Sequence, residues 1–148
     1  MKDEMTEVAA NSGLLTVRLV SPDRLLLDAT AVSVELPSSA GYLETLYGAA
    51  PLLSELGAGE VRLHGGTSGD QVYFVAGGFV EVLPERVTIL AETAVLPSEI
   101  DTNEAQQELE QGAKMWQEAG DDPAKYDSAN TVSRRAEEKL ASAKGESA

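Results

Sequence analysis

The feature that most restricts the fold of this chain is a change of hydrophobic period near Pro97. From position 14 to about position 96, apolar and polar residues alternate in short runs, as in Leu15-Thr16-Val17-Arg18-Leu19. An alternation with period two is typical of antiparallel strands that bury one face. After Pro97 the sequence is rich in Ala, Glu, Gln and Lys, and the period rises to about 3.6 residues, which indicates helices. The sequence predicts a mainly β fold with a helical C-terminal part.

Turn residues divide the first part into short strands. Ser21-Pro22-Asp23 and Pro37-Ser38-Ser39 end the early runs. A Gly-rich segment at residues 65–70 and the segment 83–86 each separate two apolar runs, which predicts two hairpins. This spacing favours an antiparallel β-sandwich or flattened barrel of eight or more strands.

The second part contains signals for two helices that form an antiparallel hairpin. Asp101 is a candidate N-cap, and Gly120-Asp121-Asp122-Pro123 ends one helix and begins the next. The expected apolar stripes are Ala105, Leu109, Ala113 and Trp116 on the first helix, and Tyr126, Ala129, Val132, Ala136, Leu140 and Ala143 on the second. Because Ala-rich stripes bury little area, we expect weak docking of the hairpin on the sandwich. The predicted domains are a flexible acidic tail (1–13), the β-sandwich (14–97) and the helical hairpin (98–148).

Composition excludes several classes of function. The formal net charge of -14 opposes binding to nucleic acid, which requires clustered Lys and Arg. The chain has no Cys, so disulfides and thiolate chemistry are excluded. No apolar run approaches the roughly 20 residues that cross a bilayer, so we expect no direct bilayer insertion.

A search for catalytic and ligand-binding motifs leaves little. His64 is the only histidine, and one histidine with no carboxylate pair at ligand spacing does not make a metal site. The sequence has no phosphate-binding loop and no nucleophile elbow. We therefore expect no catalytic residue, no metal and no cofactor, and an enzyme is the least favoured class.

Basic residues collect on the second predicted helix, including Arg134, Arg135 and Lys139. They are candidates for a regulatory contact with an acidic partner. Ordinary pairing with acidic residues on the same helix explains the pattern equally well.

Four segments together resemble the epsilon subunit family of F-type ATP synthases. They occur in the family's order and spacing, and the helical hairpin follows where that family has one. The segments are Leu19-Val20-Ser21-Pro22-Asp23-Arg24, Gly48-Ala49-Ala50-Pro51-Leu52-Leu53, Gly77-Gly78-Phe79-Val80-Glu81-Val82 and Val87-Thr88-Ile89-Leu90-Ala91-Glu92-Thr93-Ala94.

The resemblance implies a sandwich of about ten strands with two C-terminal helices, in a non-catalytic subunit of the central stalk. Such a subunit couples rotation of the membrane c ring, through the gamma subunit, to ATP synthesis, and its helices are candidates for inhibiting ATP hydrolysis. The implied partners are gamma, the c-subunit ring and, through the hairpin, the catalytic alpha/beta head. The implied location is peripheral, at the cytoplasmic face of a bacterial plasma membrane.

The resemblance also assigns contact regions. The candidates for contact with gamma are Gly48, Ala49, Ala50, Pro51, Leu52, Leu53, Gly77, Gly78 and Phe79. The candidates that face the c ring are Ser38, Ser39, Ala40, Gly41 and Tyr42.

Three departures from the family pattern affect these assignments. The usual Pro-Gly-His-Ala-Pro is Tyr47-Gly48-Ala49-Ala50-Pro51 in this chain, and Tyr42 and Glu44 replace a common acidic residue and a Gly. In the motif that binds ATP in some relatives, Glu104 occupies the position of an Arg. Because a carboxylate repels phosphate, we expect weak or absent ATP binding, with Asp101 and Arg135 as weak candidates.

A second interpretation comes from a different class. The chain could be a free-standing β-sandwich adaptor or a small-ligand binding module in which the helices are only structural. Copurification with gamma and the catalytic subunits distinguishes the two interpretations.

Overall fold

The computed structural model describes residues 13–146. The expected acidic tail therefore lies outside the described residues apart from Gly13. The elements are β1 (Leu15–Val20), β2 (Leu25–Ala31), β3 (Ser33–Ser38), β4 (Gly41–Leu46), β5 (Leu52–Glu55), β6 (Ala58–His64), β7 (Gln71–Val82), β8 (Arg86–Val95), the 3-10 helix η1 (Pro97–Glu99), α2 (Thr102–Gln117) and α3 (Pro123–Lys144).

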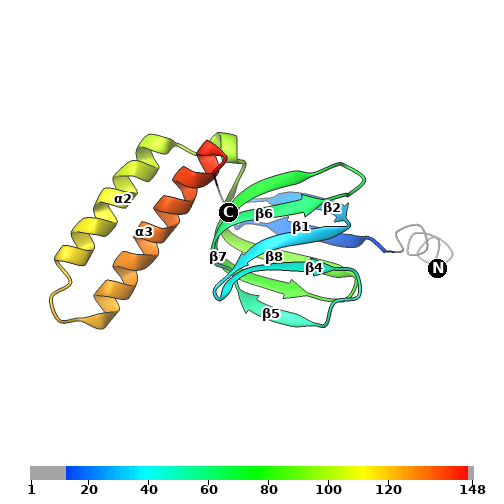
Figure 1. The fold of residues 1–148 in the computed structure, drawn as a ribbon, viewed down its shortest axis with the longest axis horizontal. Coiled ribbons are helices and arrows are strands. Elements are labelled where there is room, and N and C mark those ends of the chain that lie inside the picture. The colour runs from blue at the N-terminus through cyan, green and yellow to red at the C-terminus, as the bar shows by residue number, and fades with distance from the viewer. Residues whose placement is uncertain (1–12, 147–148) are drawn as a thin grey trace.

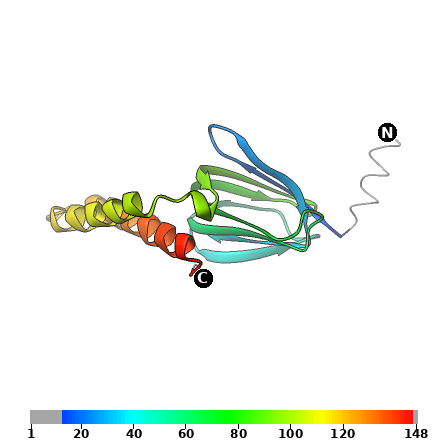
Figure 2. The ribbon, with the colours of Figure 1, turned by 90° about the horizontal axis from the view of Figure 1, so that it is seen from above.

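All eight strands belong to one hydrogen-bonded sheet that folds over into two layers (Figures 1 and 2). The strand order is β2-β1-β8-β7-β6-β3-β4, and β5 pairs with β7 beside this path. Neighbouring strands are antiparallel except β1 and β8, which are parallel. The predicted fold class, an antiparallel β-sandwich followed by a helical hairpin, is confirmed.

Strand β7 accounts for part of the difference between the eight strands found within residues 13–146 and the roughly ten that the resemblance implied. Residues 71–76 of β7 pair with β6, and residues 79–82 pair with β5. Gly77 and Gly78 lie between these two stretches, both with positive φ. One continuous strand therefore contributes to two different pairings.

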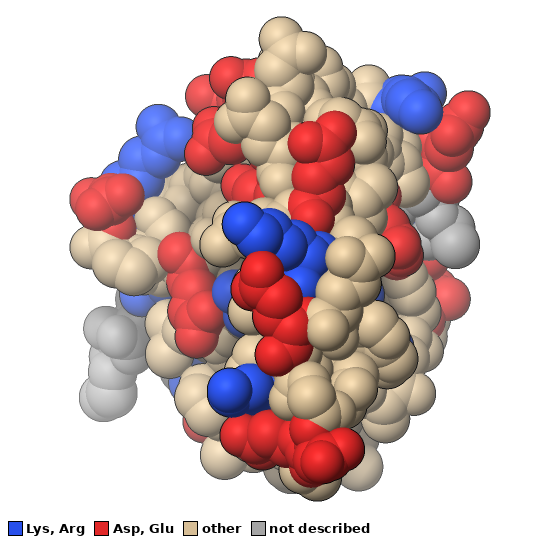
Figure 3. All heavy atoms as spheres, turned by 90° about the vertical axis from the view of Figure 1, so that its left-hand side faces the viewer, with Lys and Arg blue, Asp and Glu red and all other residues tan. Residues whose placement is uncertain are grey.

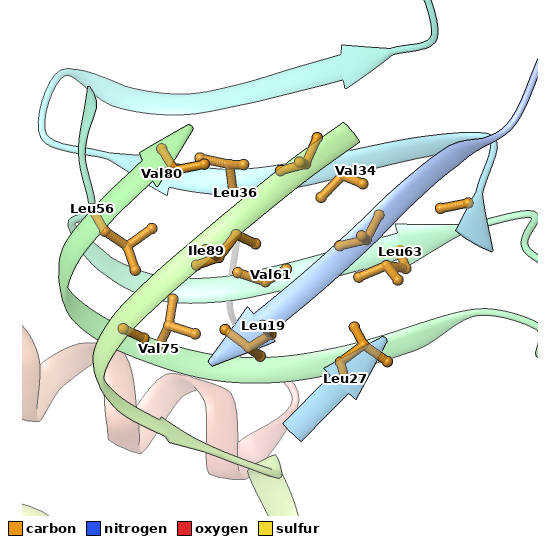
Figure 4. Packing of buried hydrophobic residues seen from close by; sticks show 14 of the residues in the cluster. Leu19, Leu27, Val34, Leu36, Leu56, Val61, Leu63, Val75, Val80 and Ile89 are labelled. Atoms are coloured by element: carbon orange, nitrogen blue, oxygen red, sulfur yellow. The ribbon is translucent and has the colours of Figure 1, made fainter. Parts of the chain in front are cut away.

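The core lies between the two layers and follows the predicted alternation. Leu15, Val17 and Leu19 of β1 are fully buried. Figure 4 shows that Leu19 shares the space between the layers with Val61 of β6 and with Ile89 of β8. Burial of each such side chain stabilises the fold by about 1.5–3 kcal/mol, so the sandwich has a core of its own.

Both helices begin where the sequence predicts. The Asp101 carboxylate accepts hydrogen bonds from the backbone N–H groups of Asn103 (3.0 Å) and Glu104 (3.1 Å). Asp122 caps α3 by accepting from the N–H of Ala124 at 3.0 Å, and Pro123 follows as the first helical residue. These caps satisfy N–H groups that have no partner inside the helix.

The predicted apolar stripe of α2 is partly wrong. Ala105 is buried, but Ala113 and Trp116 are exposed, and Gly112 and Ala119 are buried in their place. The reason is the close approach of α3: a Cβ added to Gly112 would overlap the Ser133 hydroxyl. The helices therefore meet along a line of small residues, one position away from the predicted stripe. The exposed Trp116 ring packs edge-on against Tyr126, with ring centres 4.5 Å apart.

The hairpin projects from one end of the sandwich (Figure 2). Its contacts with the strands come mainly from α3, which touches β6 and β7. Within the part of the chain that the structure describes, the helices lack an apolar stretch of the length needed to span a bilayer.

Candidate partner-binding surfaces

Pairing of β5 with β7 brings two predicted contact segments together. Leu52 and Leu53 lie on β5, directly beside the part of β7 that begins at Phe79. Ala50 and Pro51 are exposed in the preceding loop, and Ala49 packs against the core. The two predicted segments are separated by 23 residues in the sequence (54–76), yet the sheet joins them into one surface.

An apolar row crosses the outer face of this part of the sheet. Phe79 of β7 pairs with Leu90 of β8, Leu90 pairs with Val20 of β1, and Val20 pairs with Leu25 of β2. Phe79 and Leu90 are each 52% exposed, and Leu53 of β5, which pairs with Glu81 and lies diagonal to Phe79, is 72% exposed. We call Leu25, Val20, Leu90, Phe79 and Leu53 the outer apolar row. Contiguous exposed apolar residues of this kind mark protein-binding surfaces.

The three glycines among the predicted gamma contacts have different surroundings. The Gly48 N–H donates to the Pro84 carbonyl oxygen at 2.6 Å, which ties its loop to the β7–β8 turn. Gly78 lies against the backbone carbonyl of Leu90, where a side chain would overlap that oxygen. Gly77 lies beneath the side chains of Glu92 of β8 and Arg135 of α3, so it does not belong to the outer apolar row.

The predicted ring-facing residues form the tight turn between β3 and β4. The Ser38 hydroxyl donates to the Gly41 carbonyl at 2.6 Å and accepts from the N–H of Ala40 at 3.2 Å. The Ser39 N–H donates to the Glu55 carbonyl at 3.0 Å, which fixes the turn against the end of β5. Tyr42 is 41% exposed, and its phenol reaches across to β6.

The three predicted regulatory cations have different environments. Arg135 forms an ion pair with Glu92 of β8 at 3.2 Å, directly above Gly77. Lys139 forms an ion pair with Glu108 of α2 at 3.0 Å. Arg134 is exposed and forms no ion pair with any residue that the structure describes. Of the three, Arg134 can therefore meet a partner without breaking an ion pair within residues 13–146, although its charge also acts on Glu138 one turn along α3.

Acidic and basic side chains alternate on the face that carries the hairpin (Figure 3). This mixture is compatible with the pairing of basic and acidic residues that the sequence analysis offered as the alternative to a contact with an acidic partner. An open groove of about 430 Å3 separates the sandwich from α3, with Ser39 and Gly77 on one side and Asp127, Asn130 and Arg134 on the other.

Both weak candidates for nucleotide binding are occupied by other contacts. The Asp101 carboxylate caps α2, and the Arg135 guanidinium pairs with Glu92. Glu104 is exposed in the first turn of α2. Weak or absent ATP binding remains a prediction.

His64 lies half-exposed at the end of β6. Its Nε2 is 2.7 Å from a Glu35 carboxylate oxygen, and its Nδ1 is 3.8 Å from Asp70. Within residues 13–146, no group of His, Asp and Glu side chains has an arrangement that could hold a metal ion.

Glu138 of α3 is a partly buried carboxyl group whose pKa the fold raises. Burial raises its pKa above the ordinary value, the charges of Glu137 and Glu60 add to the rise, and Arg134 opposes it. Because the folded state favours the protonated form, Glu138 contributes favourably to the free energy of unfolding below its ordinary pKa. This contribution is lost as pH rises through the higher pKa of the folded state.

Replacing Glu138 with glutamine should therefore stabilise the docked hairpin at neutral pH. We expect a gain in melting temperature of about 2 °C near pH ~7 and none near pH ~4, where the native side chain is already protonated. Thermal unfolding followed by circular dichroism measures the difference at each pH. Glu110→Gln is the control, since Glu110 is an exposed carboxylate of the same hairpin and is not among the charges that raise the pKa of Glu138. A gain equal to that of the control at both pH values contradicts the prediction.

Several functional candidates escaped the sequence analysis. The exposure of Leu90 could have been predicted, because this apolar residue alternates in phase with Thr88 and Glu92 on the polar face of its strand. Buried Glu60 had no such signal, since its partner Ser142 is 82 residues away.

Comparison with known proteins identifies related chains. A family model described as ATP synthase, Delta/Epsilon chain, beta-sandwich domain matches residues 14–97. The ATP synthase epsilon chain of Microcystis aeruginosa is 38% identical over 133 residues, covering 88% of this chain and 96% of the relative. That of Halalkalibacterium halodurans is 39% identical over 126 residues, covering 85% and 94%.

Solved structures show the same fold. A chain in the Euglena gracilis mitochondrial ATP synthase, determined with OSCP, F1 and the c-ring, superposes with a TM-score of 0.71 at 20% identity. The match covers 85% of this chain and 79% of that chain.

Proposed function

This chain belongs to the ATP synthase epsilon family, and from that premise we propose that it couples rotation of the c ring, through gamma, to ATP synthesis. The family resemblance is confirmed by the match over residues 14–97 and by relatives that cover most of the chain. The chain is thus an accessory subunit of ATP synthase, and the assembled complex is the enzyme. The division into a sandwich (14–97) and a hairpin (98–148) is part of the proposal.

The outer apolar row is the observation that carries the proposed contact with gamma. Phe79, Leu53 and Leu90 expose apolar surface that a sandwich with its own core does not need for folding. Ion-paired Arg18 and Asp28 flank the row (3.3 Å), which gives it a polar rim. An apolar centre with a polar rim is the usual anatomy of a protein interface. Gly48 and its loop extend this surface beside β7.

The turn at residues 38–42 is the proposed contact with the c ring. It is short, internally hydrogen-bonded and held to β5, so it presents a fixed shape to a partner. A subunit placed between gamma and the ring is peripheral to the membrane, and the bacterial relatives favour the cytoplasmic face of the plasma membrane.

Copurification tests the proposal. Tagged chain expressed with the other subunits should bring down gamma together with the catalytic alpha and beta subunits. The rival interpretation, a free-standing adaptor or small-ligand module, gains support from the open groove beside α3. Recovery of the tagged chain without gamma would favour that rival.

Inhibition of ATP hydrolysis by the hairpin is the finer part of the proposal, and Arg134 is its best test. Loss of Arg135 would disturb the contact of α3 with β8, and loss of Lys139 would disturb the contact of α3 with α2, in addition to any contact with the catalytic head. Arg134→Gln should raise ATP hydrolysis by the membrane-bound complex about twofold or more, consistent with loss of one charged contact.

Lys125→Gln provides the control for Arg134→Gln, since Lys125 is an exposed cation on the same helix. Hydrolysis is measured in inverted membrane vesicles that contain equal amounts of complex. Equal rates for wild type and Arg134→Gln would count against an inhibitory contact at this position.

A further inference from the structure

Tyr42 occupies a gap in the hydrogen-bonding ladder between β3 and β6. The pairing of β3 with β6 ends at Glu35–Arg62. The next N–H on this side of β6, that of Glu60, donates to the Tyr42 hydroxyl at 2.9 Å. Gly59 makes room for the phenol, because a Cβ at this position would overlap the Tyr42 hydroxyl. The Arg62 guanidinium lies 5.6 Å from the centre of the Tyr42 ring. Tyr42 thus replaces a missing strand partner of Glu60.

Glu60 connects this tyrosine to the C-terminal helix. It is only 7% exposed, and one carboxylate oxygen accepts from Arg62 at 2.9 Å. The other oxygen accepts the hydroxyl of Ser142, near the end of α3, at 2.7 Å. Ser142 is 2% exposed. Glu60 therefore donates a hydrogen bond to Tyr42 through its backbone N–H and accepts one from the hairpin through its side chain.

We propose that Tyr42, Glu60 and Ser142 form a coupling element that links occupancy of the β3–β4 turn to docking of α3 on the sandwich. The inference rests on the proposed function for the identity of the partner at the turn, the membrane c ring. The coupling itself is a property of this chain. Tyr42 is a positioning residue, because it acts on Ser142 only through Glu60.

The two states are α3 docked, with Ser142 on Glu60, and α3 released at this end. Release is permitted because Glu60 keeps its ion pair with Arg62, so no charge is left buried without a partner. The contacts of the hairpin with the strands are otherwise sparse: the Arg135–Glu92 pair is partly exposed, and an open groove separates the two parts. A single buried hydrogen bond to a carboxylate is therefore a large share of the docking energy.

Tyr42 is accessible to a partner, since 41% of it is exposed at the predicted ring-facing turn. A contact that draws the phenol away removes the partner of the Glu60 N–H. The start of β6 can then shift, which moves the carboxylate away from Ser142. By reciprocity, docking of α3 favours the turn conformation in which Tyr42 lies on Gly59.

Amide hydrogen exchange in the isolated full-length chain tests the coupling. Ser142→Ala should raise exchange at residues 139–144 about tenfold, as expected for loss of one hydrogen bond to a charged group. Tyr42→Phe, which removes one oxygen and keeps the ring, should raise exchange at the same residues about threefold or more. In the double variant, the two effects should be less than additive, because both act through Glu60.

Matched controls are available for both substitutions. Tyr47→Phe changes a tyrosine of similar exposure, 44%, that directly follows the C-terminal end of β4. Ser128→Ala changes an exposed serine of the same helix that donates only to its own helix. Exchange in β8 serves as the check that the sandwich remains folded.

Unchanged exchange at residues 139–144 in Tyr42→Phe, with slow exchange retained in β8, would overturn the proposal. Strict additivity of the two substitutions would overturn it as well. Because the isolated chain contains neither gamma nor the ring, these results are independent of copurification, which tests the proposed function alone.

Discussion

Replacing Gly78 with alanine is expected to lower the free energy of unfolding by roughly 3 kcal/mol or more, because two separate costs combine. The residue has φ +112°, and a Cβ would overlap the carbonyl oxygen of Leu90 on the neighbouring strand. The obstacle is backbone of a core strand, so it cannot rotate away as a flexible side chain would. Urea denaturation followed by circular dichroism measures the loss.

Gly69→Ala is the control that separates the two costs. Gly69 also has positive φ, +78°, but a Cβ there would meet no atom within 4 Å. Its substitution should cost only the backbone term, about 1 kcal/mol. Equal losses at Gly78 and Gly69 would show that the close approach of β7 and β8 is not a strict requirement.

Replacing Leu90 with aspartate is expected to weaken binding to gamma about 100-fold or more while leaving the fold intact. The side chain lies at the centre of the outer apolar row, between Phe79 and Val20. The few hot-spot residues near the centre of an interface contribute about 2 kcal/mol or more, and a buried unpaired carboxylate adds a desolvation cost. Phe79→Asp should have the same effect. The affinity is measured with purified gamma by calorimetry.

The control is Leu46→Asp, since Leu46 is exposed to the same 52% but lies on β4, outside the row. Its affinity for gamma should remain within a few-fold of wild type. If Leu46→Asp and Leu90→Asp lose affinity alike, the row is not the gamma surface. If neither loses affinity, gamma binds another face.

Local patterns in the sequence predicted the sandwich and the helix boundaries. Alternation located the buried residues of β1, and Asp122-Pro123 marked the start of α3, because these signals depend on near neighbours along the chain. The failure on α2 has a clear cause. Helical periodicity defines a stripe only to within about one position, and Gly112, which reads as a weak helix former, is the point of closest approach to α3.

The candidate site was predictable only in part. The segments at Gly48 and Phe79 were identified through the family resemblance, but their adjacency requires the pairing of β5 with β7. Gly77 and Phe79 are two residues apart in sequence, yet one lies under the Arg135–Glu92 pair and the other on the outer apolar row. The link between Tyr42, Glu60 and Ser142 depends on three distant segments meeting, which no local pattern encodes.

Strand β7 has a mechanical consequence for a subunit that turns with a shaft. Since residues of a strand rise about 3.3 Å each, only about 7 Å separates the seat of the hairpin at Gly77 from the proposed gamma contact at Phe79. Strand β7 is paired with β8 both before and after these residues, so Gly77 and Phe79 are held rigidly relative to each other. If gamma transmits torque to Phe79, the part of the sandwich on which the hairpin rests would therefore rotate together with gamma. Any rotation of the hairpin relative to the sandwich would then occur in the short connection between β8 and α2.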